Sequence, residues 1–215
     1  MNPKEKETVA YHEAGHALVA EARPRTDRVT KISIIPRGVA ALGYTQQTPG
    51  EDRYLMTRAD LLERIDVLLG GRVAEEMVFG DVSTGARNDL QRATDLARQM
   101  VTQYGMSERL GLATLEDARA ALFLDGPVMP GRKEYSEHTA EAIDEEVRMI
   151  LADAHTRVSE TLSARRGLLD TLARLLLEKE MVGRGELDQL LGAADETRHS
   201  AVQDPADAVH SNPAP

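Results

Sequence analysis

The sequence predicts a mainly α-helical fold with a small β element and an all-helical C-terminal half. Aromatic residues make up 3% of the 215 residues, and Trp is absent. The apolar residues are mostly Leu, Ala, Val, Ile and Met, a composition that favours helices over an all-β protein. Apolar positions recur at helical spacing over most of the chain, whereas strand-like alternation is confined to residues 29–47. The length suffices for one or two domains with a sizeable core.

Composition also argues against several classes of protein. The net charge is −10 and there is no basic tract, so nucleic acid is not expected as a partner, because phosphate binding needs clustered Lys and Arg. The absence of Cys excludes disulfides, thiolate zinc sites and cysteine nucleophiles. No stretch approaches the ~18–20 apolar residues of a membrane span. Residues 1–6 lack the apolar core of a signal peptide, and we expect a soluble polypeptide.

The N-terminal part is predicted to form a helix followed by a β hairpin. The helix runs from about Pro3 to Ala22, with proline in the first turn, where it is tolerated. Arg23-Pro24 ends the helix, since a residue before proline avoids helical geometry. Strand-like runs follow over Val29–Ile35 and Leu42–Gln47, and the Pro36-Arg37-Gly38 turn between them allows the two to pair.

Two helices are predicted in the middle of the chain. The first begins after Thr57, an N-cap with Asp60 in a capping-box position, and it continues through Met77. Gly70-Gly71 is expected to interrupt this helix, but paired glycines also allow another element to approach the backbone closely. The second helix spans roughly Asn88–Tyr104.

The C-terminal half is expected to be helical after an irregular segment at 111–135. Long helices are predicted at about 137–164 and 166–180, followed by a short helix. The predicted organisation is one domain over 1–192 and a tail over 193–215. The tail is rich in Ala, Asp and Pro, lacks apolar periodicity and is expected to be disordered.

His12, Glu13 and His16 form an H-E-x-x-H motif on the predicted first helix. One helical turn separates the two histidines, so both imidazoles lie on the same face and can bind one zinc ion. Glu13 lies about a quarter turn from His12, where it can accept a proton from a water at the metal without binding the metal itself. The motif therefore predicts a zinc hydrolase with Glu13 as general base.

A simpler interpretation is that an exposed helix carries these three residues by chance. The motif is flanked by four apolar residues, Val9, Ala10, Ala17 and Leu18. This pattern indicates a half-buried helix, in which polar groups without a role are costly. The context favours the metal site.

A third ligand is required, because catalytic zinc usually has three protein ligands and one open position. The extended motif with a further histidine is absent, since no histidine follows at the required distance. Spacing leaves six candidates open, which are Glu75, Glu76, Asp81, Asp89, Asp95 and His138. For Asp89 the alternative role is that of a carboxylate stabilising the N-terminal end of its helix.

Over residues 4–191 the sequence resembles the peptidase domain of the FtsH family of ATP-dependent membrane proteases. The resemblance rests on motifs that occur in the same order as in the family. They are V-A-Y-H-E-A-G-H-A-L-V at 9–19, the run at 29–38 that ends in I-I-P-R-G, L-G-Y-T at 42–45, G-G-R-V-A-E-E at 70–76, S-T-G-A-R-N-D-L at 83–90 and the segment 100–111.

The resemblance implies a zincin-like active-site helix and one Zn²⁺ per subunit. It implies that the metal is bound by three side chains, His12, His16 and Asp89, and that Glu13 is the general base. It also implies that Glu75 and Glu76 lie on a helix near the site, where we expect one of them to orient a ligand histidine. A solvated helix face is the alternative for these two glutamates.

The resemblance also implies partners. Family members are homohexamers in which an ATPase ring feeds unfolded or membrane proteins to the peptidase sites, at the cytoplasmic face of the bacterial inner membrane or an organelle equivalent. This chain has no membrane span and no G-x-x-x-x-G-K-[ST] phosphate-binding loop. Membrane anchoring and any use of ATP are therefore expected from a module outside this chain. The chain itself is then either a fragment or a stand-alone relative.

For substrate binding we expect an extended peptide to pair with the edge of the Val29–Ile35 strand, along Ile32, Ser33 and Ile34. Strand addition contacts the backbone and so tolerates many sequences. Two functions other than an endopeptidase remain open. One is a module that oligomerises and binds proteins without cleaving them, and the other is a zinc hydrolase of small amides.

Overall fold

The computed structural model describes residues 2–36, 43–48, 55–116 and 135–202. Its helices are α1 (Pro3–Ala22), α2 (Arg58–Phe79), α3 (Arg87–Thr102), α4 (Glu137–Ala164), α5 (Arg166–Lys179) and α6 (Arg184–Val202). Its strands are β1 (Arg28–Ser33), β2 (Tyr44–Thr48) and β3 (Met181–Gly183). The predicted class, mainly α with a small β element, is confirmed. No helix in these ranges is both long enough and apolar enough to cross a bilayer.

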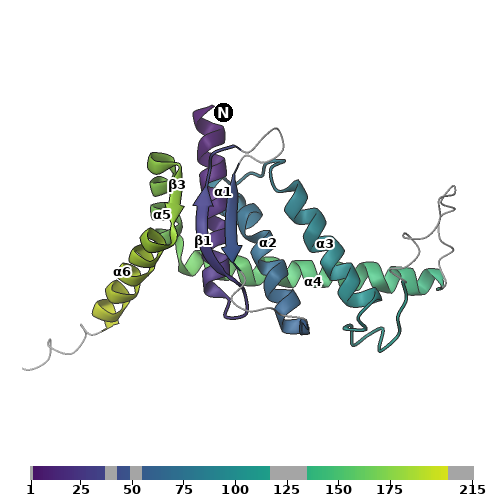
Figure 1. The fold of residues 1–215 in the computed structure, drawn as a ribbon. Coiled ribbons are helices and arrows are strands. Elements are labelled where there is room, and N and C mark those ends of the chain that lie inside the picture. Colours follow the sequence, from purple (N-terminus) through teal and green to yellow (C-terminus); the bar gives the residue numbers. More distant parts are fainter. Residues whose placement is uncertain (1, 37–42, 49–54, 117–134, 203–215) are drawn as a thin grey trace, which may run out of the picture.

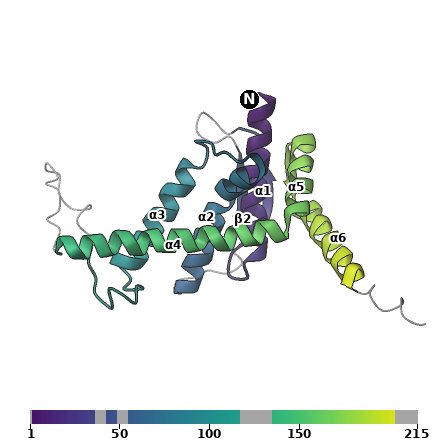
Figure 2. The same cartoon turned by 180° about the vertical axis from the view of Figure 1, so that it is seen from behind.

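Helix α1 lies at the centre of the molecule, between the small sheet and α4 (Figure 1). It packs against α2, α5 and β1. The long helix α4 crosses behind α1 and α2, and in the reverse view it lies in front of them (Figure 2). The side chains around the H-E-x-x-H motif are consequently enclosed on several sides.

Helices α1 and α2 begin at N-caps that their sequences encode. The side chain of Asn2 accepts a hydrogen bond from the backbone N–H of Glu5, and the carboxylate of Glu5 accepts one from the N–H of Asn2. Thr57 and Asp60 form the same reciprocal pair at the start of α2, as predicted. Gly80 ends α2 with a φ of 64°, a conformation that glycine adopts without strain.

The paired glycines of α2 bring it unusually close to α1. A Cβ on Gly15 would lie 2.4 Å from the carbonyl oxygen of Gly70, and a Cβ on Gly71 would lie 2.5 Å from Cε1 of His12. The predicted close approach is confirmed. The predicted interruption is wrong, because α2 continues through both glycines. Tertiary packing of a helix outweighs the weak helix propensity of two residues.

The sheet has the order β2-β1-β3, so β1 is its central strand. Strands β1 and β2 form the predicted antiparallel hairpin, from Arg28 opposite Thr48 to Ser33 opposite Tyr44. Leu42, where the second strand was expected to begin, lies outside the described residues. Strand β3 adds to the other side of β1. The sequence does not predict β3, since three residues are too few to show a period.

Helix α6 extends to Val202, beyond the predicted end of the domain. Residues 193–202, which were expected to belong to the tail, continue this helix, and three of them are Ala, the best helix former. Residues 203–215 lie outside the described ranges, as does 117–134, most of the segment that was expected to be irregular.

Candidate metal centre

Three side chains from two helices converge beside the sheet. His12 and His16 come from α1 and Asp89 from the first turn of α3, and their donor atoms lie within 4.8 Å of one another. The two Nε2 atoms are 3.0 Å apart, and each is 3.5 Å from Oδ2 of Asp89. Ligand atoms about 2.0–2.1 Å from a tetrahedral zinc ion lie roughly 3.4 Å from each other. The two Nε2 atoms and Oδ2 of Asp89 therefore form a triangle, called the metal triangle below, with the dimensions of a zinc site.

The hydrogen bonds of the two imidazoles determine which nitrogen faces this triangle. Nδ1 of His16 lies 2.7 Å from the carbonyl oxygen of Val67, which can only accept, so Nδ1 carries the proton. Nδ1 of His12 lies 2.6 Å from Oε1 of Glu75, another acceptor. In the neutral imidazoles both Nε2 atoms are then unprotonated. Together with the Asp89 carboxylate they place three electron lone pairs close together. These lone pairs repel one another unless a cation binds among them.

Electrostatics at the triangle also favour a bound positive charge. Burial lowers the pKa of His12, but hydrogen bonds with Asp89 and Glu75 outweigh burial and raise the pKa to about 9. Burial raises the pKa of Asp89, but hydrogen bonds with both histidines outweigh it and hold the pKa below its usual range. A divalent cation would supply the positive charge and leave both imidazoles neutral, as metal ligands must be.

Glu13 lies beside the triangle and is only 6% exposed. The hydroxyl of Thr45, in β2, donates a 2.8 Å hydrogen bond to Oε2 of Glu13. A Cβ on Gly43 would lie 2.7 Å from Oε1, so the backbone before β2 passes directly over this carboxylate. Burial raises the pKa of Glu13, which brings it closer to the value of an effective general base near neutral pH.

Glu75 holds two parts of the site together from α2. Its Oε1 accepts the bond from His12, and its Oε2 accepts a 2.8 Å bond from the backbone N–H of Ser83, in the loop that leads to Asp89. Burial raises the pKa of Glu75, but the bonds from His12 and Ser83 outweigh it and lower the pKa. The side chain thus remains a carboxylate that fixes the His12 ring and also holds the loop that leads to Asp89.

The structure separates Glu76 from this site. Its side chain is 52% exposed and pairs with His155 of α4 at 3.0 Å. Successive helical residues point about 100° apart, so Glu75 and Glu76 cannot both face His12. Of the two candidates, Glu75 is therefore the one that lies against His12, and Glu76 lies on the solvated helix face that was the alternative.

The remaining ligand candidates do not join the triangle. Asp81 accepts a bond from the backbone N–H of Val82, and Asp95 accepts one from Gln91 within α3. His138 is exposed in the first turn of α4.

Ile32, Ser33 and Ile34 do not offer an edge for a substrate. They are 0%, 1% and 2% exposed, and β1 is paired with β2 on one side and with β3 on the other. The backbone N–H of Ile34 donates to the carbonyl of Glu180. This finding corrects the prediction of pairing with β1, because the unpredicted strand β3 occupies the edge that we expected to be open.

The residues that sequence reasoning missed are Gly43 and Thr45, which hold Glu13, and Val67, which holds His16. Gly43 and Thr45 lie in the L-G-Y-T segment that carries part of the family resemblance. Val67 acts through its backbone carbonyl, so its side chain carries no signal.

A cavity of about 490 Å³ adjoins the metal triangle. His16, Asp89 and Thr45 form the part of its wall nearest the site, and Met56, Val67 and Leu68 provide apolar surface. A side chain of a peptide lying across the triangle therefore has room beside it.

Comparison with known proteins identifies what this chain is similar to. The model of peptidase family M41 matches residues 1–190. An ATP-dependent zinc metalloprotease FtsH of Ralstonia pickettii is 66% identical over 90% of this chain, and one of Syntrophobacter fumaroxidans is 60% identical over 95%. A third, from Burkholderia pseudomallei, is 55% identical over 95%. The chain spans between 27% and 31% of the length of these curated relatives.

Proposed function

This chain belongs to peptidase family M41, and on that premise we propose that it is a zinc metalloendopeptidase domain acting on unfolded or misfolded proteins. The observation that carries the proposal is the convergence of three lone pairs, from His12, His16 and Asp89, beside the buried carboxylate of Glu13. A binding module that does not cleave has no need for a base at that place.

The residues divide the chemistry between them. His12, His16 and Asp89 would hold Zn²⁺, which when bound acidifies water and polarises a carbonyl group. Glu13 accepts the proton of the attacking water and passes it to the departing amine. Thr45 fixes the orientation of Glu13 through its 2.8 Å hydrogen bond.

The outer side of β2 is the better place for an extended substrate. In the described part of the sheet β2 has β1 as its only neighbour, and Thr45 of β2 contacts Glu13 directly. A peptide that adds to the sheet along Thr45–Thr48 would therefore pass the general base with its backbone. Strand addition supplies affinity with little demand on side chains, which suits a protease of unfolded proteins.

The remaining parts of the function lie outside this chain. The three relatives are named as ATP-dependent, and we propose that ATP is used only by an ATPase module that this chain does not contain. By resemblance to the family, the domain acts as a homohexamer on unfolded or membrane proteins, at the cytoplasmic face of the bacterial inner membrane. Nucleic acid is not proposed as a partner.

Casein degradation tests the proposed function, because casein is unfolded and requires no ATPase. The purified chain is supplied with zinc and compared with Glu13→Gln, with zinc content measured in both. We expect cleavage by the wild-type chain alone and equal zinc in both proteins. Casein that stays intact with zinc bound would favour the non-cleaving module, and activity on short acyl amides but not on casein would favour the amide hydrolase.

A further inference from the structure

Two arginines line the cavity beside the metal triangle and have no acidic partner in the described part of the chain. Arg64 comes from α2 and Arg92 from α3, and both are exposed. Within the described residues neither forms an ion pair, and the only polar contact of Arg64 is a 3.7 Å approach to the sulfur of Met56. The chain has 36 acidic and 26 basic residues, so two guanidinium groups at one cavity that form no ion pair with a described residue are unexpected.

Helical spacing places both arginines next to the residues that hold the metal. Arg92 lies three residues after the ligand Asp89 on α3, and residues at that spacing share a helix face. Arg64 lies three residues before Val67 on α2, whose carbonyl binds His16. Since α2 and α3 pack against each other, the two guanidinium groups border the cavity from adjoining helices.

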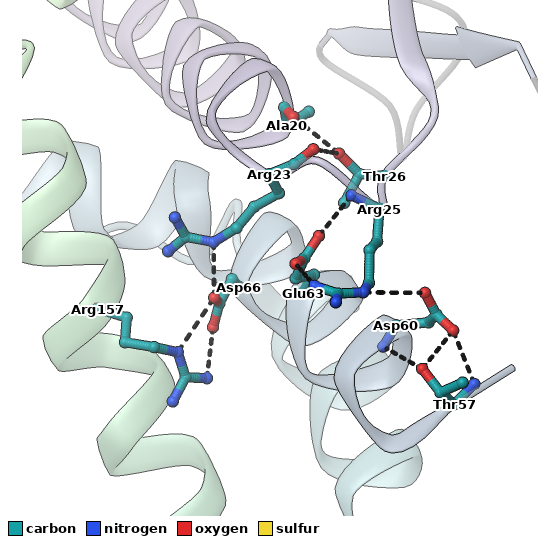
Figure 3. A network of polar contacts seen from close by, with 9 residues as sticks. All are labelled: Ala20, Arg23, Arg25, Thr26, Thr57, Asp60, Glu63, Asp66 and Arg157. Atoms are coloured by element: carbon teal, nitrogen blue, oxygen red, sulfur yellow. Dashed lines mark hydrogen bonds and ion pairs between the residues drawn. The ribbon is translucent and has the colours of Figure 1, made fainter.

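The other charges of the cavity are either compensated or lie elsewhere. Arg25 pairs with Glu63 at 3.1 Å and approaches Asp60 at 4.0 Å, as Figure 3 shows. Asp60 also caps α2 through Thr57. Asp27 reaches the cavity from the loop between α1 and β1, and Asp89 is the proposed metal ligand. On α2 and α3, Arg64 and Arg92 are therefore the lining residues whose positive charge has no ion-pair partner among the residues that the structure describes.

We propose that Arg64 and Arg92 bind a carboxylate of the peptide substrate, so that peptides with an acidic group entering this cavity are preferred. A guanidinium group presents a planar fork of donors that matches a carboxylate. The net negative charge of the protein repels acidic groups of a substrate at long range. The two arginines provide a local positive charge, so a substrate carboxylate is most stable beside them. The carboxylate comes from an Asp or Glu side chain or from the end of a chain. This inference rests on the proposed endopeptidase function.

Binding to the zinc-loaded Glu13→Gln protein tests the proposal without cleavage. Fluorescent peptides of one length carry Asp or Asn at successive positions, and a further pair ends in a free carboxylate or an amide. We expect one member with the acidic group to bind about fivefold more tightly than its neutral partner, an effect that weakens as salt is added. If the tighter binding occurs in an Asp/Asn pair, the carboxylate comes from a side chain. If it occurs in the pair with a free or amidated end, the carboxylate comes from the end of the peptide.

Two variants complete this binding experiment. Replacing both arginines, as Arg64→Gln with Arg92→Gln, is expected to abolish the difference, whereas Asp27→Asn is the matched control and is expected to keep it. The absence of any preference for a carboxylate in the protein with both arginines would overturn the proposal. A preference that persists in the double variant would do so equally.

Cleavage of the same peptides separates this inference from the function on which it rests. For the wild-type chain we expect the preference to appear in kcat/KM, mainly through KM, since the arginines bind substrate and take no part in the proton transfer. If none of the peptides is cleaved, the endopeptidase proposal fails, and the binding comparison still decides whether the arginines select a carboxylate.

Discussion

Among single residues, Glu75 shows best how the metal ligands are held in place. Its two oxygens bind His12 and the backbone of Ser83, so one carboxylate supports the proposed ligands of both α1 and α3. The neighbouring Glu76 is bound to His155 at the surface. Two adjacent glutamates thus have unrelated surroundings, and the pair offers a matched comparison.

Glu75→Gln is expected to lower the affinity for zinc about 10- to 100-fold. An amide has one acceptor oxygen, so its NH₂ group must face the N–H of either His12 or Ser83, donor against donor. Competition with a chromogenic chelator measures the affinity. Glu76→Gln is the control and should bind zinc as the wild-type chain does, and equal affinities for all three proteins would contradict the role of Glu75.

Among the helices, the contact of α1 with α2 determines where the histidines lie. It has no space for a methyl group at Gly15 or Gly71, since the added atom would lie within 2.4 or 2.5 Å of its neighbours. At Gly71 that neighbour is the His12 ring, which Glu75 already holds in place. The close packing of these helices therefore also positions His12, a proposed metal ligand.

Gly71→Ala is expected to lower both the melting temperature and the affinity for zinc. Alanine improves helix propensity by roughly 1 kcal/mol, but the clash with His12 must displace either the ring or the helix. Gly167→Ala, in α5 with no neighbouring atom within 4 Å, is the control and should leave zinc binding unchanged while slightly stabilising the fold. Thermal unfolding and chelator competition measure the two quantities. Unaltered zinc binding in Gly71→Ala would show that the ring has space to move.

At the scale of the whole molecule, one buried carboxylate joins three helices. Asp66 of α2 is 1% exposed and binds Arg23, at the end of α1, at 2.9 Å and Arg157, of α4, at 2.7 Å (Figure 3). Its neighbour Val67 provides the carbonyl for His16. The cluster therefore connects the packing of the helices with the metal site.

Asp66→Ala is expected to lower the free energy of unfolding by about 3–5 kcal/mol, because two arginines lose their partner in a largely buried place. Urea denaturation measures this loss. Glu145→Ala removes an exposed carboxylate that pairs with Arg148, and it should leave the midpoint almost unchanged. A similar small effect for both variants would mean that water replaces the lost carboxylate at Asp66.

Metal removal should destabilise the whole domain, because zinc would link α1 to α3. At a free zinc concentration of 1,000 times Kd the stabilisation is about 4 kcal/mol. We expect a chelator to lower the melting temperature and added zinc to restore it. Asp89→Ala should show a much smaller response to zinc. If the melting temperature of the wild-type chain does not change with the zinc concentration, metal binding is not linked to folding.

The sequence by itself determined the features that depend on neighbouring residues. The bounds of α1, the cap of α2 at Thr57 and the shared face of His12 and His16 all follow from interactions within about four positions along the chain. The function class followed from the same motif and from the family resemblance. The pairing of β1 with β2 also joins neighbouring parts of the sequence, since β1 ends at Ser33 and β2 begins at Tyr44.

Only the tertiary structure decided what depends on distant parts of the chain. Spacing left six candidate ligands open, of which the resemblance singled out Asp89. Spacing also could not separate Glu75 from Glu76, because which of them faces His12 depends on how α2 rotates against α1. Strand β3 comes from the far end of the domain and pairs with the edge of β1. Among the described strands, the edge on the hairpin side that has no neighbour is therefore the outer edge of β2. Packing between segments that are remote in the sequence determines which side chains face each other and which strand edges are paired. A local pattern of residues cannot predict either.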